Sequence, residues 1–206
     1  MAENLHIKTE ALRSEAKKIM DSGCRTKGSQ IIAFAEYIRA RYGQGDLLKV
    51  EAVINELGYS FAFSQLRLGE WYKEGFHVLS LFVAKHLFGW SEKDIYDVGY
   101  TANKISASTK IYIKFFSSKE KTFKYTPVYW RKFVDCGIID AHEFNDKERH
   151  CTLWLKDYAS HPIMCHYLAG YFASVTENAV SGGEVKIQET KCIFKGDSYH
   201  EFILKW

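Results

Sequence analysis

The sequence has little proline, no long uninterrupted apolar run and almost no net charge. Two prolines and 14 glycines in 206 residues are too few for long flexible linkers. The most apolar stretch, residues 76–90, is interrupted by His77, Lys85 and His86, whereas a membrane-spanning helix needs roughly 20 apolar residues. The formal net charge of +3 lacks the basic excess of nucleic-acid-binding proteins. We therefore expect neither a membrane protein nor a direct nucleic-acid binder.

The N-terminus also lacks the apolar core of a signal peptide, because residues 1–18 are mostly polar. The cysteines are odd in number and widely scattered, which fits a reducing compartment better than a disulfide framework. These two features predict a cytoplasmic protein with reduced thiols. The length suits a helical N-terminal extension over residues 1–28 followed by a single ligand-binding domain over residues 29–206.

The order of the expected elements predicts an α+β fold. Hydrophobic periodicity predicts helices over residues 30–42, with Ser29 as its cap, then over 46–57 and 69–88. Ser91 and Asp94 form a capping box for the next helix, Pro127 begins another, and residues 110–116 fit a strand or a helix equally well. Further along, strand-like runs flank one more helix from Pro162; these runs cover residues 138–144, 150–158, 184–194 and 199–206. The expected architecture is N-terminal helices packed on a small, mainly antiparallel sheet.

Four side chains of the types that bind zinc occur in the last quarter of the chain: Cys165, Glu189, Cys192 and His200. Three belong to the last expected hairpin, whose turn would bring Cys192 and His200 together across the strands. Glu189 and Cys192 are three residues apart, so a bulge is needed to turn both toward the same face. The spacing alone fits a metal site and two buried apolar cysteines equally well.

The segments CHYLAGY from Cys165 and ETKC from Glu189, followed by Gly196 and His200, resemble the vinyl-4-reductase-type small-molecule-binding domain. That domain also forms the sensor of phenol- and xylene-responsive transcription activators. The resemblance implies a structural zinc ion on Cys165, Glu189, Cys192 and His200, with His200 standing where the aromatic sensors have cysteine. It further implies a homodimer and a fold related to TRAPP transport-particle subunits and to haem-based nitric oxide sensors. The chain has no Tyr-x-Ser-x-Arg haem motif, so haem is not expected.

In this family the ligand pocket lies between the helices and the sheet, near the metal. The aromatic residues expected to line it here are Trp130, Phe133, Phe144, Trp154, Tyr167 and Tyr171, with Trp71, Tyr72, Phe76 and His77 as further candidates. Each of these side chains fits an ordinary core position as well.

The function expected from the resemblance is a zinc-containing sensor that binds a small hydrophobic or aromatic molecule and signals through a partner protein or output domain, as in transcription regulation. The alternative is a structural or adaptor subunit with a TRAPP-like fold and no regulatory ligand. We do not expect an enzyme, because no Gly-x-Gly-x-x-Gly nucleotide cradle is present and four protein ligands would leave zinc no position for water.

Overall fold

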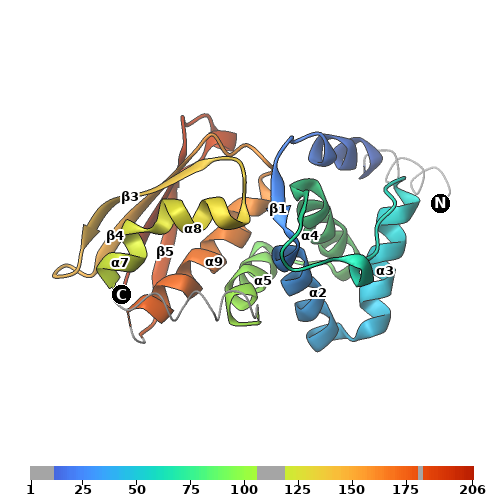
Figure 1. The fold of residues 1–206 in the computed structure, drawn as a ribbon, viewed down its shortest axis with the longest axis horizontal. Coiled ribbons are helices and arrows are strands. Elements are labelled where there is room, and N and C mark those ends of the chain that lie inside the picture. The colour runs from blue at the N-terminus through green and yellow to red at the C-terminus, as the bar shows by residue number, and fades with distance from the viewer. Residues whose placement is uncertain (1–11, 106–118, 181–182) are drawn as a thin grey trace.

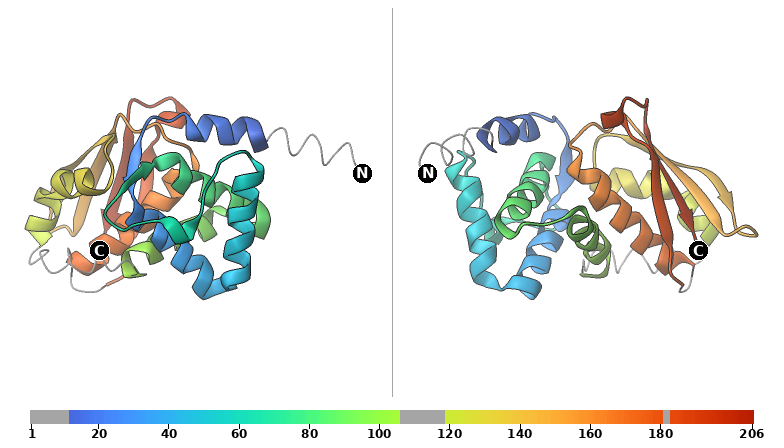
Figure 2. Two further views of the ribbon diagram at one scale, coloured as in Figure 1. Left: turned by 45° about the vertical axis from the view of Figure 1, so that its right-hand side comes forward. Right: turned by 180° about the vertical axis from the view of Figure 1, so that it is seen from behind.

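The computed structural model describes residues 12–105, 119–180 and 183–206. A helical part made of α2, α3 and α4 lies beside a four-stranded sheet that is covered by α7, α8 and α9 (Figures 1 and 2). Helix α5 lies where the two parts meet, and it packs closely against α9. The expected α+β fold with an antiparallel sheet is confirmed.

The helices of the first part end at residues that cannot easily continue a helix. Helix α2 spans Gly28–Tyr42 and α3 spans Gln44–Glu56, separated by Gly43 at a φ of 93°. Helix α4, Glu74–Phe88, ends at Gly89 in the left-handed conformation, which costs glycine nothing because it has no Cβ. The expected capping box then starts α5, Glu92–Ile105, where the Asp94 carboxylate accepts hydrogen bonds from the backbone N–H and hydroxyl of Ser91.

Two details of the expected helices are wrong. The helix expected from residue 69 begins only at Glu74, because Trp71–Lys73 form strand β2 and pair with β1, Arg25–Lys27. Ser29 is not a cap, since α2 already starts at Gly28. Residues 110–116, expected as strand or helix, lie outside the described residues. The extension over residues 1–28 and the domain over 29–206 remain predictions.

The sheet has the strand order β3-β4-β6-β5, and all of its neighbouring strands are antiparallel. Its inner face carries the alternating apolar residues of the central strands, with Leu153 of β4 opposite Phe202 of β6. Helix α8 packs on β3, whereas α9 packs on β5 and β6 (Figure 1). The bounds are α7 Lys119–Lys124, α8 Thr126–Phe133, β3 Ile138–Asn145, β4 His150–Lys156, α9 Ile163–Ala179, β5 Lys186–Lys191 and β6 His200–Lys205.

Helices α5 and α9 approach so closely that each carries a glycine at the contact. A Cβ added to Gly170 of α9 would lie 2.0 Å from the backbone oxygen of Tyr96, and one added to Gly99 of α5 would lie 1.9 Å from that of Tyr167. Atoms at these distances overlap, so a side chain at either position would push the helices apart. Gly170 of the CHYLAGY segment therefore has a packing role.

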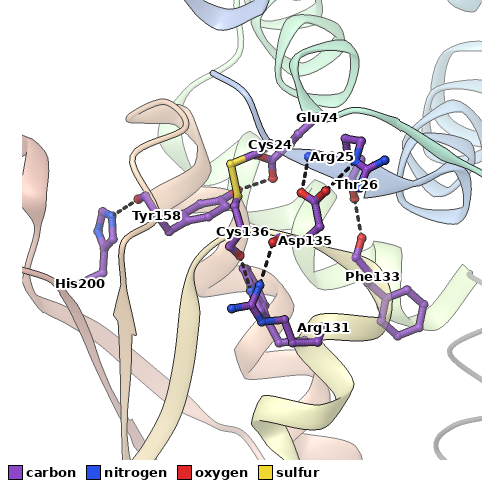
Figure 3. The surroundings of a disulfide bond; sticks show 11 residues. Cys24, Arg25, Thr26, Glu74, Arg131, Phe133, Asp135, Cys136, Tyr158 and His200 are labelled. Carbon is purple, nitrogen blue, oxygen red and sulfur yellow. Dashed lines mark hydrogen bonds and ion pairs between the residues drawn. A yellow bond between two sulfur atoms is a disulfide. The ribbon is translucent and has the colours of Figure 1, made fainter. Parts of the chain in front are cut away.

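A disulfide joins Cys24 to Cys136, which corrects the expectation that all five cysteines are reduced (Figure 3). Cys24 directly precedes β1, and Cys136 lies between α8 and β3. Next to the disulfide, Asp135 accepts hydrogen bonds from the backbone N–H and the guanidinium of Arg25, each at 2.6 Å. The two chain segments therefore meet in space although they are 112 residues apart. Within the parts of the chain that the structure describes, no helix is long and apolar enough to cross a membrane.

Candidate metal centre and adjoining cavity

The four predicted zinc ligands converge at one end of the sheet. Cys165 comes from the first turn of α9, Glu189 from β5, Cys192 from the residue just after β5, and His200 from the start of β6. One potential ligand atom of each lies within 4.8 Å of all the others. The two cysteines and the histidine are buried, and Glu189 is half-buried. The structure thus brings together all four residues named from the sequence.

The distances among these atoms are those of an approximately tetrahedral zinc site. The Sγ atoms of Cys165 and Cys192 are 3.7 Å apart, and two thiolates about 2.3 Å from a tetrahedral zinc ion would be about 3.8 Å apart. The Nδ1 atom of His200 lies 3.9 Å from Sγ of Cys165 and 3.0 Å from Oε1 of Glu189. The arrangement can therefore hold an ion that is coordinated by two sulfurs, one nitrogen and one oxygen.

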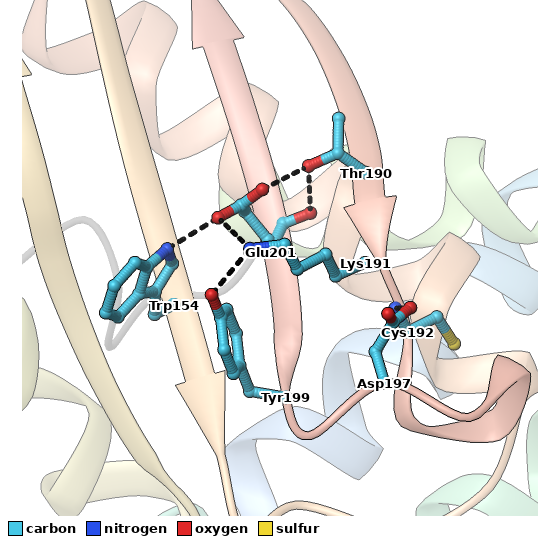
Figure 4. Close-up of polar contacts among 7 residues, drawn as sticks. All are labelled: Trp154, Thr190, Lys191, Cys192, Asp197, Tyr199 and Glu201. Carbon is cyan, nitrogen blue, oxygen red and sulfur yellow. Dashed lines mark hydrogen bonds and ion pairs between the residues drawn. The ribbon is translucent and has the colours of Figure 1, made fainter.

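The bulge required between Glu189 and Cys192 is present in β5. Glu189 pairs with Phe202 and Lys191 pairs with Glu201, so Thr190 has no partner of its own in the register. The Thr190 hydroxyl instead donates a 2.8 Å hydrogen bond to the carboxylate of Glu201 (Figure 4). The extra residue reverses the alternation of side chains, so Glu189 and Cys192 both face the cluster.

A tight turn fixes the position of Cys192 after the bulge. Its backbone N–H donates to the Asp197 carboxylate at 2.8 Å (Figure 4), and its carbonyl accepts hydrogen bonds from the backbone N–H groups of Lys195 and Asp197. Gly196 has a φ of 99°, a conformation that suits glycine. The Glu-x-x-Cys-x-x-x-Gly spacing is therefore the spacing of a bulge followed by a turn.

The hydrogen bonds of His200 point to a cation in the cluster. Its Nε2 lies 3.1 Å from the carbonyl oxygen of Tyr158, which can only accept, so Nε2 carries the proton and donates. In the neutral ring, Nδ1 then presents a lone pair to the Glu189 carboxylate. Two lone pairs facing each other repel; either a second proton on the ring, which lets Nδ1 donate to Glu189, or a metal ion between the two atoms removes that repulsion.

The thiols and the carboxylate of the cluster respond to burial in different ways. Burial, followed by the charge of Glu189 and the neighbouring Cys192, raises the pKa of Cys165 far above its usual range. Burial also tends to raise the pKa of Glu189, but hydrogen bonds from His200 and Cys165 outweigh it and lower that pKa. Without a metal the Cys165 thiol would keep its proton, whereas a bound divalent ion stabilises the thiolate.

A cavity lies between α4, α8, α9 and the inner face of the sheet, and it encloses about 970 Å³ including its open mouth. Four of the six predicted pocket residues line it: Trp130, Phe133, Tyr167 and Tyr171. Of the further candidates only His77 does. The described lining residues also include Glu74, Phe123, Tyr129, Tyr158 and Phe172, which the sequence did not single out.

Trp154 and Phe144 lie outside this lining, which corrects the expected pocket. Leu153 and Leu155 face the core, so Trp154 between them points to the opposite face of the sheet. There it donates to Glu201 at 2.7 Å (Figure 4). Phe144 lies near the end of β3 and packs against the rings of Phe123 and Trp206. The alternation of the 150–156 run is a signal that would have excluded Trp154.

Two paths connect the cluster to the cavity, one along α9 and one through hydrogen bonds. Helix α9 carries Cys165 together with the cavity residues Met164 and Tyr167. Tyr158 accepts the His200 hydrogen bond through its backbone carbonyl, and its hydroxyl donates a hydrogen bond to Glu74 at 2.6 Å (Figure 3). The cluster and the cavity wall therefore share α9 and Tyr158.

Comparison with known proteins gives a likeness of fold. No protein-family model and no curated protein sequence matches the chain. Among solved structures, an H-NOX protein from Shewanella oneidensis in the Fe(II)NO state matches with a TM-score of 0.66 at 10% identity, covering 87% of this chain and 98% of the other. An Fe(II) unliganded H-NOX protein from K. algicida (TM-score 0.60, 14% identity, 87% and 95% covered) and an oxygen-binding H-NOX domain related to soluble guanylate cyclases (0.62, 11%, 87% and 94%) are also similar.

The cavity does not fit a haem group, although H-NOX structures carry haem iron. The described lining residues include no lysine or arginine that could pair with the two carboxylates of haem. Their acidic member, Glu74, would repel those carboxylates. The chain has the α+β architecture of H-NOX domains, with N-terminal helices and a four-stranded antiparallel sheet.

Proposed function

We propose that this chain is a zinc-stabilised sensor module that binds a small, mainly apolar or aromatic molecule and acts through a partner protein or output domain. Zinc is bound by Cys165, Glu189, Cys192 and His200, and the ligand occupies the cavity lined by α9. The H-NOX-like fold supports a small-ligand binder.

This proposal rests on one observation: helix α9 contributes residues to both the cluster and the cavity. The first turn of the helix provides Cys165 to the cluster, and the next turns provide Tyr167, Leu168 and Tyr171 to the cavity. A closed four-ligand site holds the fold together and performs no hydrolysis, since no position is left for water. Zinc thus fixes one end of the helix whose other residues contact the ligand, and the module is not an enzyme.

The cavity also favours a binding role over a purely structural one. Its walls combine aromatic and aliphatic side chains with polar groups, which is the composition of sites for small, mainly apolar ligands. An adaptor subunit needs no such space.

The metal is tested by elemental analysis of purified, untagged protein by inductively coupled plasma mass spectrometry. We expect about one zinc per chain in the wild type and none in Cys165→Ala or His200→Ala. Cys151→Ala is the matched control, because Cys151 is also a buried free cysteine but lies in β4, outside the cluster. Freshly purified, reduced wild-type protein without metal would contradict the zinc assignment.

The ligand site is tested separately with toluene as a probe, by nuclear magnetic resonance titration. Val175 is half-buried at the cavity wall, so Val175→Trp should fill the space and abolish binding without removing zinc. Equal toluene binding by wild type and Val175→Trp would place the ligand elsewhere.

A further inference from the structure

Four polar residues of the cavity wall, Glu74, His77, Tyr158 and Tyr167, lie next to one another and are called the polar end below; the lining also contains Gln30, Tyr129 and four threonines. All four side chains are at most 2% exposed. Tyr158 donates to one oxygen of the Glu74 carboxyl group. The other oxygen, Oε2, makes no direct hydrogen bond in the described part of the chain, although the Ser160 hydroxyl lies near enough to Glu74 to lower its pKa. Nε2 of His77 and the hydroxyl of Tyr167 also lack hydrogen-bond partners there. Buried polar atoms without partners are costly and rare in proteins, so this end is prepared for a group that the protein does not supply.

The charge of this end is negative or zero, and never positive near neutral pH. Burial lowers the pKa of His77 to about 4, so its imidazole is neutral. Burial raises the pKa of Glu74 to about 7, although the hydrogen bond from Tyr158 opposes this. No lysine or arginine belongs to the described lining residues. An ionised Glu74 therefore has no cationic partner within the cavity wall.

The walls around Glu74 are faces and edges of aromatic rings. The ring of Tyr167 lies 4.8 Å from that of His77, and Trp130 packs edge-on against Tyr158 at 5.5 Å. Aromatic faces attract cations, most strongly when water is excluded. The attraction between a carboxylate and a cation extends over several ångströms in a medium of low dielectric constant, so an ammonium group bound against the rings need not touch Glu74 to be stabilised by it.

We propose that the ligand class of this cavity is an apolar or aromatic amine, whose ammonium head lies at the polar end and pairs with the Glu74 carboxylate. The neutral His77 and the Tyr167 hydroxyl accept hydrogen bonds from the remaining ammonium protons. The apolar part of the molecule packs on the rings of α8 and α9. A carboxylic acid of the same shape is repelled, and an alcohol lacks the charge that Glu74 attracts. This inference rests on the proposed function, because it concerns the same cavity.

The test uses three probes of similar shape that differ in the head group: 2-phenylethylamine, 2-phenylethanol and 3-phenylpropanoate. Affinities are measured by isothermal titration calorimetry at pH 8, where Glu74 is ionised. We expect the amine to bind at least about tenfold more tightly than the alcohol, and the acid to show no binding. The variant Glu74→Gln retains the shape and removes the charge, so it should weaken amine binding about tenfold and change alcohol binding less than threefold. Glu70→Gln, at an exposed position outside the cavity, is the matched control.

The pH dependence in the wild type gives a second readout that needs no variant to fold. The groups beside Glu74 are Tyr158, Ser160, Asp135, Tyr167 and the Cys24–Cys136 disulfide. Burial raises the pKa of Glu74 to about 7, whereas His77, one turn further along α4, stays neutral above about pH 5. Because ionised Glu74 strengthens amine binding about tenfold, the amine affinity should fall by up to about tenfold in all as the pH is lowered from 8 to 5. Alcohol binding should stay constant.

The outcomes distinguish a failure of the amine inference from a failure of the proposed function. If the alcohol or the acid binds as tightly as the amine, or if Glu74→Gln binds the amine unchanged, the amine inference is wrong while the cavity remains a ligand site. If toluene and all three probes fail to bind, the proposed ligand-binding function fails together with it.

Discussion

The two pairs of neighbouring cysteines lie in different chemical surroundings. Cys165 and Cys192 have a carboxylate and an imidazole beside them, and their sulfurs are 3.7 Å apart. Among the described residues, the ligand group around Cys24 and Cys136 has Glu74 as its one further member, and the two sulfurs are bonded to each other. A pair of thiols with two further ligands can hold a metal ion, whereas a pair with one cannot complete a four-ligand shell. Each pair brings together segments that are distant in the sequence, one in a group that can hold an ion and the other through a covalent bond.

The largest effect is expected from breaking the metal pair. His200→Ala should lose zinc and lower the free energy of unfolding by about 5 kcal/mol or more, because the binding energy of structural zinc adds directly to folding energy. Urea unfolding followed by circular dichroism measures this loss. The control Cys151→Ala should retain zinc and unfold within about 2 kcal/mol of the wild type.

The disulfide pair should contribute less. The bond closes a loop of 112 residues; the loss of chain entropy in the unfolded state gives an upper value of about 5 kcal/mol, and because measured disulfide contributions typically reach about 2–4 kcal/mol, we expect about 4 kcal/mol. Cys136→Ser should lower the free energy of unfolding by that amount and leave the zinc content unchanged. A phosphine reductant should lower the melting temperature of the wild type and not that of Cys136→Ser. Equal responses of the two proteins to the reductant would show that the bond does not form.

The Glu74 carboxyl group next to the disulfide gives a pH-dependent effect. Its pKa is raised from 4.5 to about 7 in the fold, so the folded state binds a proton more tightly than the unfolded state does. The contribution of Glu74 to the free energy of unfolding is therefore greatest below pH 4.5. About 3 kcal/mol of this contribution is lost as the pH rises to 7. Glu74→Gln should lack this loss. A difference in unfolding energy between the two proteins that stays constant from pH 5 to 8 would contradict the raised pKa.

The smallest effect is expected at the contact of α5 and α9. Gly170→Ala places a methyl group where 2.0 Å separates it from the Tyr96 backbone oxygen, and such overpacking costs about 2 kcal/mol. Zinc and the disulfide should both remain. Gly45→Ala in α3 is the control, because a Cβ there meets nothing within 4 Å, and it should leave stability unchanged or slightly increased. Equal melting temperatures for Gly170→Ala and the wild type would mean that the helices are farther apart.

The sequence predicted the metal pair and missed the disulfide for a physical reason. Glu189, Cys192 and His200 belong to one hairpin, so local spacing and turn residues already specify how they meet. Cys24 and Cys136 meet only because β1 lies beside the segment after α8, which no local pattern indicates. The expected helix ends at residues 42 and 88 are likewise confirmed, because the glycine that follows each of them is a local signal.

The cavity likewise includes residues that the sequence predicted and a contact between distant residues that it did not. Tyr167 and Tyr171 were predicted because they belong to α9 next to Cys165, and they do line the cavity. The hydrogen bond from Tyr158 to Glu74 joins residues 84 positions apart. That bond, and with it the polar end of the cavity, depends on the packing of α4 against the sheet side of the molecule and has no signature in the sequence.

Zinc K-edge X-ray absorption spectroscopy on the purified, reduced protein tests the central claim most directly, because it counts the ligands and measures their distances. We expect two sulfur neighbours at about 2.3 Å and two nitrogen or oxygen neighbours at about 2.0–2.1 Å, with the spectrum of Cys151→Ala unchanged. A shell of oxygen and nitrogen alone, or a shell of four sulfurs, would contradict the assignment of Cys165, Glu189, Cys192 and His200.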